Sequence, residues 1–122
     1  MKSRLPAEFR ERTKRYAAEV IRLFVKLPKP QEEVRVIGKQ LLRSGTSVAA
    51  HVREASRARS EAEFVSKLGG ALQEADESSL WLELLREECR VSANLTIPLE
   101  RESSELIAIF TTMINRTNER GT

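Results

Sequence analysis

A histidine and a glutamate three residues apart are the first side chains that could carry out chemistry. His51 and Glu54 lie on one face of any helix that contains them, and imidazole and carboxylate groups both bind divalent metals. Because the chain has one histidine, the paired Glu-x-x-His motifs of a di-iron bundle cannot form within it. The pair is a candidate for a single-metal or intersubunit site, and the alternative is a hydrogen bond at a surface or an interface.

Other reactive groups are few. Cys89, the one cysteine, falls on an apolar helical stripe with no histidine assigned to it, so we expect it to pack as a small apolar residue. It can form no intrachain disulfide, which suits a reducing cytoplasm. Residues 44–47, Ser-Gly-Thr-Ser, lack the Gly-Lys-Ser/Thr ending of a phosphate loop. We therefore predict no catalytic residue, no metal, no cofactor, no small-molecule substrate and no enzymatic activity.

Four amphipathic helices are expected to position these side chains. Apolar residues recur at spacings of three and four through most of the 122 residues, and the chain contains only four prolines. Ser60 and Glu63 form the capping-box pattern at the start of the third helix, while Thr96 followed by Pro98 predicts the start of the fourth. The predicted helices span residues 6–27, 31–56, 60–91 and 97–117.

Short connections between these helices predict antiparallel neighbours in one all-α domain over residues 1–122, an up-down-up-down four-helix bundle. No strand is expected, and a composition with 32% charged and 5% aromatic residues is typical of helical bundles. The N-terminus lacks the apolar stretch of a signal peptide, and no apolar run is long enough to cross a membrane. We expect a soluble, cytoplasmic protein with no membrane partner.

Small residues are concentrated in residues 43–55, Arg-Ser-Gly-Thr-Ser-Val-Ala-Ala-His-Val-Arg-Glu-Ala, inside the second predicted helix. Its apolar stripe passes through Gly45 without slipping, so we expect close approach of a neighbouring helix there rather than a break. For the glycine pair at residues 69 and 70, close packing and a kink are both open. Trp81 and Leu84 lie off the main stripe of the third helix and are candidates for a subunit contact; the alternative is that Trp81 widens the core.

Positive charge is unevenly distributed along the chain. The formal net charge is +3, and the first 15 residues hold six Lys or Arg against two Glu. Clustered cations neutralise phosphates and release counterions, so they are candidates for contact with nucleic acid; the alternative is an ordinary solvated surface. The candidates are Arg10, Arg12, Lys14, Arg15, Arg57 and Arg59.

Two segments of the chain match a known pattern. Residues 43–55, followed by residues 60–85 with their Ser-x-x-Glu-Phe, Ala-Leu-x-Glu-Ala-x-Glu and Trp-Leu-x-Leu-Leu motifs, resemble the four-helix-bundle proteins named after 23S rRNA intervening sequences. Two residues depart from the pattern, because Ala49 stands in place of the usual glycine and His51 in place of the usual asparagine. An imidazole at that position makes hydrogen bonds that differ from those of an amide.

The resemblance implies a left-handed bundle that assembles as a homopentamer. It also implies a role with nucleic acid, because related genes lie inside rRNA insertions and a distantly similar basic pentamer is an accessory of a reverse transcriptase. We further expect Arg43, Arg53 and Glu54 to pair with charged residues of the third helix in a buried ionic network that sets the register. The candidates for this packing and polar network are Arg43, Gly45, Ser47, His51, Arg53, Glu54, Lys67, Glu74 and Glu77.

Three functions are then alternatives, in this order. The first is a pentameric accessory protein that binds the backbone of RNA or DNA without reading its sequence; five copies of a chain of charge +3 would carry +15. The second is a protein-interaction scaffold with no nucleic-acid role. The third is an enzyme or metal protein centred on His51 and Glu54.

Overall fold

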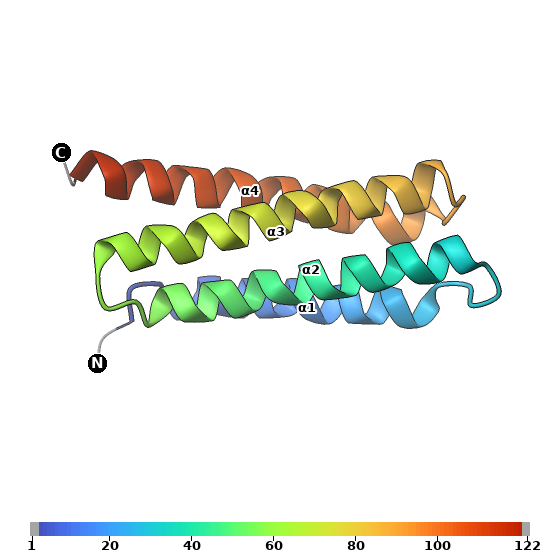
Figure 1. Ribbon diagram of the computed structural model, residues 1–122, viewed down its shortest axis with the longest axis horizontal. Helices are drawn as coiled ribbons and strands as arrows, with labels where there is room; N and C mark the ends of the chain where they lie inside the picture. The colour runs from blue at the N-terminus through green and yellow to red at the C-terminus, as the bar shows by residue number, and fades with distance from the viewer. Residues whose placement is uncertain (1–2, 121–122) are drawn as a thin grey trace.

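Four long helices make up the computed structural model, which describes residues 3–120. They are α1 (Ala7–Lys26), α2 (Glu32–Ser56), α3 (Glu61–Glu87) and α4 (Ala93–Arg120). The α1–α2 and α3–α4 connections lie at one end of the molecule, and the α2–α3 connection, the start of α1 and the end of α4 lie at the other (Figure 1). The predicted all-α four-helix bundle is confirmed, and residues 3–120 contain no strand.

Two helix boundaries follow directly from local sequence. Leu27, just after α1, is extended with a ψ of 142°, because the ring of Pro28 disfavours helical geometry in the residue before it. Ser60 stands at the N-terminus of α3, where its hydroxyl accepts a hydrogen bond from the Glu63 N–H at 3.1 Å, as the capping-box pattern predicts.

The third helix is shorter than predicted. It ends at Glu87 rather than at residue 91, because Arg90 adopts a left-handed φ of 59° that turns the chain. The N–H of Val91 then donates to the Leu85 carbonyl at 2.9 Å, a pattern of helix termination that a glycine more often supplies. Cys89 therefore lies beyond α3 and half-buried; burial first, then the charges of Glu33 and Glu88, raises the pKa of its thiol.

The predicted start of the fourth helix is wrong by four residues. α4 begins at Ala93, where the Ser92 hydroxyl accepts from the Asn94 N–H at 3.2 Å and so performs the capping role expected of Thr96. Thr96 is buried inside α4 instead, and Pro98 falls in its second turn. Serine is a better N-cap than threonine, and the burial of Thr96 also favours the earlier start at Ser92.

The core is built from the apolar stripes of all four helices. The stripe of α3 is fully packed inside, and the stripe of α2 passes through Gly45 without interruption. The largest fully buried apolar side chains are Phe110, Leu41, Leu68, Leu82, Leu85, Leu106, Val20, Val34, Val48 and Val52.

Four of the buried hydroxyls, one from each helix, form two pairs in the core. The Tyr16 and Ser103 hydroxyls lie 2.6 Å apart, and the Ser44 and Ser78 hydroxyls lie 2.7 Å apart. Ser103 and Ser78 also donate to carbonyls of their own helices. Because a shift of register would leave these groups unsatisfied in the core, this core hydroxyl set favours one alignment of the four helices.

Removal of the Tyr16 hydroxyl has an expected cost that depends on pH. Burial raises the pKa of Tyr16, against the smaller effect of hydrogen bonds from Ser103 and Ser78. The protonated Tyr16 hydroxyl therefore stabilises the folded state fully below the unfolded-state pKa of about 10. This stabilisation is lost as pH rises through the higher folded-state pKa. We expect Tyr16→Phe to lower the free energy of unfolding by about 1 kcal/mol at pH 7 and to lose less stability than wild type above pH 10. Urea titrations followed by the fluorescence of Trp81 measure both; parallel losses above pH 10 in the two proteins would contradict this role of Tyr16.

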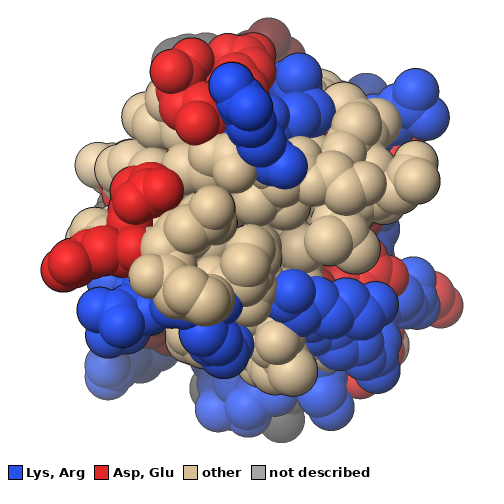
Figure 2. Space-filling model, turned by 90° about the vertical axis from the view of Figure 1, so that its right-hand side faces the viewer, with Lys and Arg blue, Asp and Glu red and all other residues tan. Residues whose placement is uncertain are grey.

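The contact between α1 and α4 is the smallest between neighbouring helices and depends on long side chains. Phe9 packs edge-on against Phe110 with ring centroids 5.8 Å apart, and Arg12 reaches Glu102. At the end that carries the α1–α2 and α3–α4 connections, Lys and Arg gather on the α1–α2 side, below an uncharged centre (Figure 2). None of the helices described combines the length and apolar character needed to cross a membrane.

Candidate nucleic-acid interface

An open groove of about 1040 Å³ lies between the N-terminal half of α1, the C-terminal half of α2 and the first turns of α3. Small residues such as Ala7, Ala49 and Ala50 line it, and their short side chains leave the space open. Six Lys or Arg also line this basic groove, against three Glu. The six cations are Arg10, Lys14, Arg53, Arg57, Arg59 and Lys67.

Most of these cations are available to a ligand. Lys67 pairs with Glu54, with 3.1 Å between Nζ and Oε2, whereas the other five make no ion pair with any residue of the range 3–120. Those five side chains are also exposed to solvent. A phosphate group entering the groove would therefore gain charge-assisted hydrogen bonds without first breaking an existing pair.

The segment before α1 holds the walls of the basic groove together. The Arg4 backbone N–H donates to the Ser56 carbonyl at 3.1 Å, and its side-chain Nε donates to the Ala58 carbonyl at 2.8 Å. Leu5 is buried in the core beside these contacts. The start of α1 is thus fixed against the α2–α3 connection, which sets the spacing between the cations of α1 and those of residues 57–59.

The structure separates the six nucleic-acid candidates into two groups. Arg10, Lys14, Arg57 and Arg59 line the basic groove, but Arg12 and Arg15 do not. Arg12 points toward α4, because residues two apart on a helix face nearly opposite directions. The groove also includes Arg53, predicted for the helix–helix network, and Lys67.

Arg12 is engaged in a structural ion pair. Its guanidinium donates two hydrogen bonds to Glu102, at 2.8 and 2.7 Å, and a longer one to Glu105 at 3.3 Å. The hydrogen bond from Arg12 holds the pKa of Glu102 below its usual range, and the same contact raises the pKa of Arg12. This bidentate pair links α1 to α4 where the two helices make their smallest contact.

Loss of the pair should destabilise the protein at neutral pH but not in acid. Because the folded-state pKa of Glu102 is depressed, its contribution is present above the unfolded-state pKa near 4.3 and is lost as pH falls through the folded value. We expect Arg12→Gln to lower the free energy of unfolding by about 1 kcal/mol at pH 7, the upper end for partly exposed pairs. Thermal unfolding at pH 7 and pH 3 measures the difference, and an undiminished cost at pH 3 would contradict the pair as its cause.

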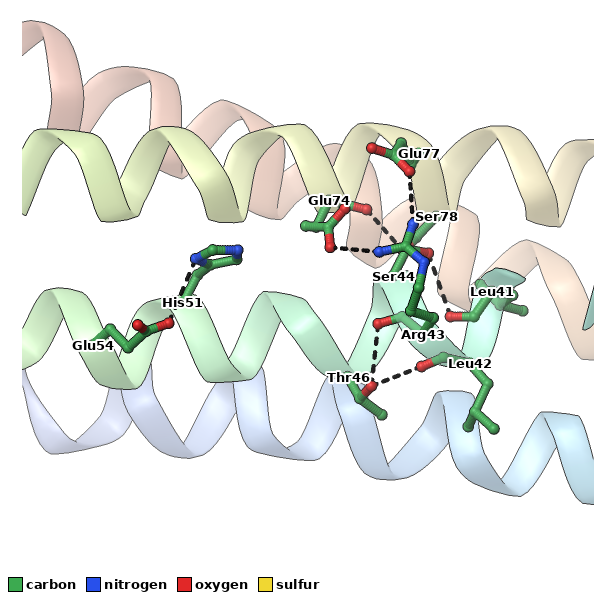
Figure 3. A network of polar contacts seen from close by, with 10 residues as sticks. All are labelled: Leu41, Leu42, Arg43, Ser44, Thr46, His51, Glu54, Glu74, Glu77 and Ser78. Carbon is green, nitrogen blue, oxygen red and sulfur yellow. Dashed lines mark hydrogen bonds and ion pairs between the residues drawn. The ribbon is translucent and has the colours of Figure 1, made fainter. Parts of the chain in front are cut away.

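Polar contacts between α2 and α3 surround the small-residue segment (Figure 3). Arg43 donates to Glu74 at 3.0 Å and to Glu77 at 2.9 Å. Arg43 therefore pairs with residues of α3 as predicted, but the expectation of burial is wrong, because the Arg43 side chain is 51% exposed. The buried polar contact of this region is the pair of hydroxyls of Ser44 and Ser78.

The small residues of this segment have two different structural roles. A Cβ atom on Gly45 would lie 2.8 Å from both Val20 methyl carbons, so the missing side chain lets α1 pack directly on α2. Thr46 turns its hydroxyl back to the Leu42 carbonyl at 2.8 Å, and Ser47 is half-buried without a side-chain hydrogen bond to any residue of the described chain. Residues 44–47 are helical, so they form no phosphate-binding loop.

The imidazole of His51 packs against Gly70 of α3. A Cβ atom on Gly70 would lie 2.8 Å from the imidazole Cε1, so close packing accounts for Gly70, and α3 continues through it without a break. The Nδ1 atom of His51 is buried and lies 3.6 Å from Glu54 Oε1, which is beyond hydrogen-bond range. Glu54 instead accepts a hydrogen bond from Lys67.

Among residues 3–120, His51 and Glu54 have no third metal-binding side chain beside them. Across residues 3–120, no three His, Cys, Asp or Glu side chains come together in a cluster that could hold an ion. A metal at His51 and Glu54 would have only two ligands from this chain and would compete with the ammonium group of Lys67 for the carboxylate.

Trp81 and Leu84, the subunit-interface candidates, are both half-buried on α3. The indole Nε1 of Trp81 is buried and has no hydrogen-bond partner within the described residues. The Arg43 ion pairs with Glu74 and Glu77 fix the register of α2 and α3. Val36 precedes Arg43 by seven residues, and Trp81 and Leu84 follow Glu74 and Glu77 by seven, so this register puts Val36 level with Trp81 and Leu84 along the helices. Val36 is 52% exposed and Leu80 is 47% exposed, which leaves apolar surface on this α2–α3 face.

Comparison with known proteins identifies the family. The family model of the 23S rRNA-intervening sequence proteins matches residues 7–112, which includes most of all four helices. The chain belongs to this family. A crystal structure of a protein with unknown function from the S23 ribosomal protein family of Bacteroides thetaiotaomicron is also similar. The two are 33% identical, the match covers 87% of this chain and 94% of that one, and the TM-score is 0.78.

No significant match to the chain was found among curated proteins. The description of the 23S rRNA-intervening sequence family and that of the Bacteroides protein contain no enzymatic activity. The matched region includes the two motif segments, the Arg43 contacts and the cations at positions 10, 14, 53, 57, 59 and 67.

Proposed function

We propose that this family member is a non-enzymatic, cytoplasmic accessory protein that self-associates, with a pentamer favoured, and binds the phosphate backbone of RNA or DNA in the basic groove. The observation that carries the proposal is the set of five exposed cations in the groove that make no ion pair within residues 3–120. Unpaired cations on one concave surface neutralise successive phosphates and release their counterions. The family's description, which refers to sequences inserted in 23S rRNA, supports RNA as one ligand.

The groove favours recognition of the backbone rather than of bases. No aromatic side chain from the described part of the chain lines it, so unstacked bases have no platform there. Its lining combines basic side chains with small residues, which suits phosphate contact and carries little sequence information. Binding should therefore be steeply salt-dependent and similar for different sequences.

Self-association would multiply the effect of one groove. Five copies of a chain with net charge +3 would carry +15 and present five basic grooves. The exposed Val36 and Leu80, beside the half-buried Trp81 and Leu84, offer the apolar surface for contact between subunits. Size-exclusion chromatography with light scattering tests this part: a mass five times that of the chain is expected, and a monomer at micromolar concentration would contradict it.

Fluorescence anisotropy tests nucleic-acid binding. Nuclease-treated protein is titrated into labelled structured RNA, single-stranded RNA and duplex DNA of equal length over a series of salt concentrations. We expect binding to each at low salt that weakens steeply as salt rises. Absence of binding to all three at low ionic strength would rule out the accessory role.

A protein-interaction scaffold is the second candidate. The apolar side chains exposed on the α2–α3 face favour it, because contiguous exposed apolar surface marks sites of protein contact. In that case the protein would bind a partner protein with an affinity that salt changes little, and the anisotropy series would show no nucleic-acid binding.

A further inference from the structure

A second cleft lies near the α1–α2 connection, at the opposite end of α1 from the basic groove. Its volume is about 150 Å³, and its lining runs from Phe24 at the end of α1 to Lys39 in α2. Lys14, the groove residue nearest to it along α1, is ten residues from Phe24, a distance of about 15 Å along the helix. The two sites are therefore separate surfaces. We call this one the end cleft; it is lined by Phe24, Leu27, Pro28, Lys29, Val34, Arg35 and Lys39.

We propose that the end cleft binds a single aromatic or large aliphatic side chain from an acidic peptide segment of a partner protein. The proposal does not depend on nucleic-acid binding in the basic groove. Two features of the end cleft support it: an apolar interior of the right size and a border of unpaired cations.

The interior of the end cleft is apolar and preformed. Leu27 and Val34 are buried beneath it, and Phe24 is half-buried at its side. Gly38 helps to shape it, because a Cβ atom there would lie 2.7 Å from Leu27 Cδ1, so Leu27 rests directly on α2. An apolar cavity of about 150 Å³ is large enough to take a benzene molecule, which matches one phenylalanine ring or a leucine side chain.

Cations border the opening of the end cleft. Lys29, Arg35 and Lys39 are exposed and make no ion pair within residues 3–120. Lys29 Nζ lies 5.2 Å from the centroid of the Phe24 ring, so this ammonium group already covers part of the apolar surface. Figure 2 shows Lys and Arg gathered on the α1–α2 side of this end of the molecule, next to uncharged surface. Carboxylates on either side of a buried apolar side chain would complement this border.

The same features disfavour a nucleotide base as the occupant. The surface that lines the interior is almost entirely apolar, so the polar edges of a base would lose their hydrogen bonds on entry. A hydrocarbon side chain has no hydrogen bonds to lose on entry, which favours a peptide.

Two labelled heptapeptides test the proposal directly. The first is fluorescein-Asp-Glu-Asp-Phe-Glu-Asp-Glu, and the second has serine in place of its phenylalanine but the same charge. We expect the phenylalanine peptide to bind wild-type protein at least about tenfold more tightly than the serine peptide, because only the first fills the cleft. Equal binding of the two peptides, or no binding of either at low salt, would overturn the proposal.

Matched double variants locate the binding site. Arg35→Glu with Lys39→Glu should weaken the phenylalanine peptide about tenfold or more, whereas Arg10→Glu with Arg57→Glu, in the basic groove, should leave it unchanged. All four side chains are exposed, so circular dichroism should show the same helix content in both variants. Peptide binding that weakens only in the groove variant would contradict the end cleft as the site. RNA binding that depends on Arg35 and Lys39, with no peptide binding, would make this end a nucleic-acid contact instead.

Discussion

Gly45→Leu is expected to lower the free energy of unfolding by about 3 kcal/mol or more, or to prevent folding altogether. Even the first added atom would lie 2.8 Å from the two methyl carbons of Val20, which is fully buried. Valine has no flexible outer end that could swing aside, so α1 would have to move away from α2. Because α1 carries two cations of the basic groove, this displacement should also weaken nucleic-acid binding in any protein that still folds.

Alanine substitutions at two helical glycines provide the control. Gly69 has no atom within 4 Å of an added Cβ, so Gly69→Ala should stabilise the protein by about 0.5–1 kcal/mol through helix propensity alone. Gly45→Ala is the same chemical change at a site without space, and it should destabilise. Urea unfolding of the two variants gives the comparison; a Gly45→Ala variant as stable as Gly69→Ala would show that α1 does not constrain this position.

The largest expected effect on binding comes from charge reversal in the basic groove. Arg10→Glu combined with Arg57→Glu replaces two unpaired cations, one on α1 and one after α2, and should weaken RNA binding by about tenfold or more. The folded state should be unaffected, because both side chains are exposed and make no ion pair within the described residues. Anisotropy with labelled single-stranded RNA measures the change.

A control with the same change in net charge separates the groove from the overall charge of the protein. Arg101→Glu combined with Arg116→Glu alters two exposed arginines of α4, neither of which lines the basic groove. This variant should retain RNA affinity within about a factor of three at moderate salt, where distant charges are screened. Equal losses in the two variants would mean that binding follows net charge and not the groove.

Periodicity predicted most of the fold because it reports which side chains face the core. The apolar stripe continued through Gly45, so the helix was predicted as continuous even though its glycine, serines and threonine favour other structures. Periodicity says less about where helices end. Ser92 and Thr96 are both good N-caps, and Arg90 takes a left-handed conformation that usually requires glycine, so these two boundaries depended on tertiary packing.

The basic groove was only partly predictable. Arg10 and Lys14 are four residues apart, which places these two cations on one face of α1, and Arg53 and Arg57 have the same spacing at the end of α2. The same rule separates Arg12 from Arg10, and counting basic residues along the N-terminus did not make that distinction. The cations of α1 lie beside those at the end of α2 only because the two helices pack together. No local sequence pattern predicts that packing.

The contacts of the core hydroxyl set and of His51 could not be predicted from the sequence, for a different reason. Tyr16 and Ser103 are 87 residues apart, and a serine on an apolar stripe is equally compatible with a partner or with none. The imidazole of His51 is accommodated because Gly70, on the facing helix, has no side chain. Each of these contacts joins residues on two different helices, so neither helix's sequence predicts it alone.

The salt dependence of RNA affinity tests binding in the basic groove most directly. Each phosphate contact contributes about −0.7 to the slope of log K against log salt for a single strand, so Arg10→Gln with Arg57→Gln should reduce the slope by about 1.4. Arg101→Gln with Arg116→Gln should leave it at the wild-type value. A slope that is unchanged in the groove variant, or reduced equally in both, would contradict the assignment of the groove as the nucleic-acid site.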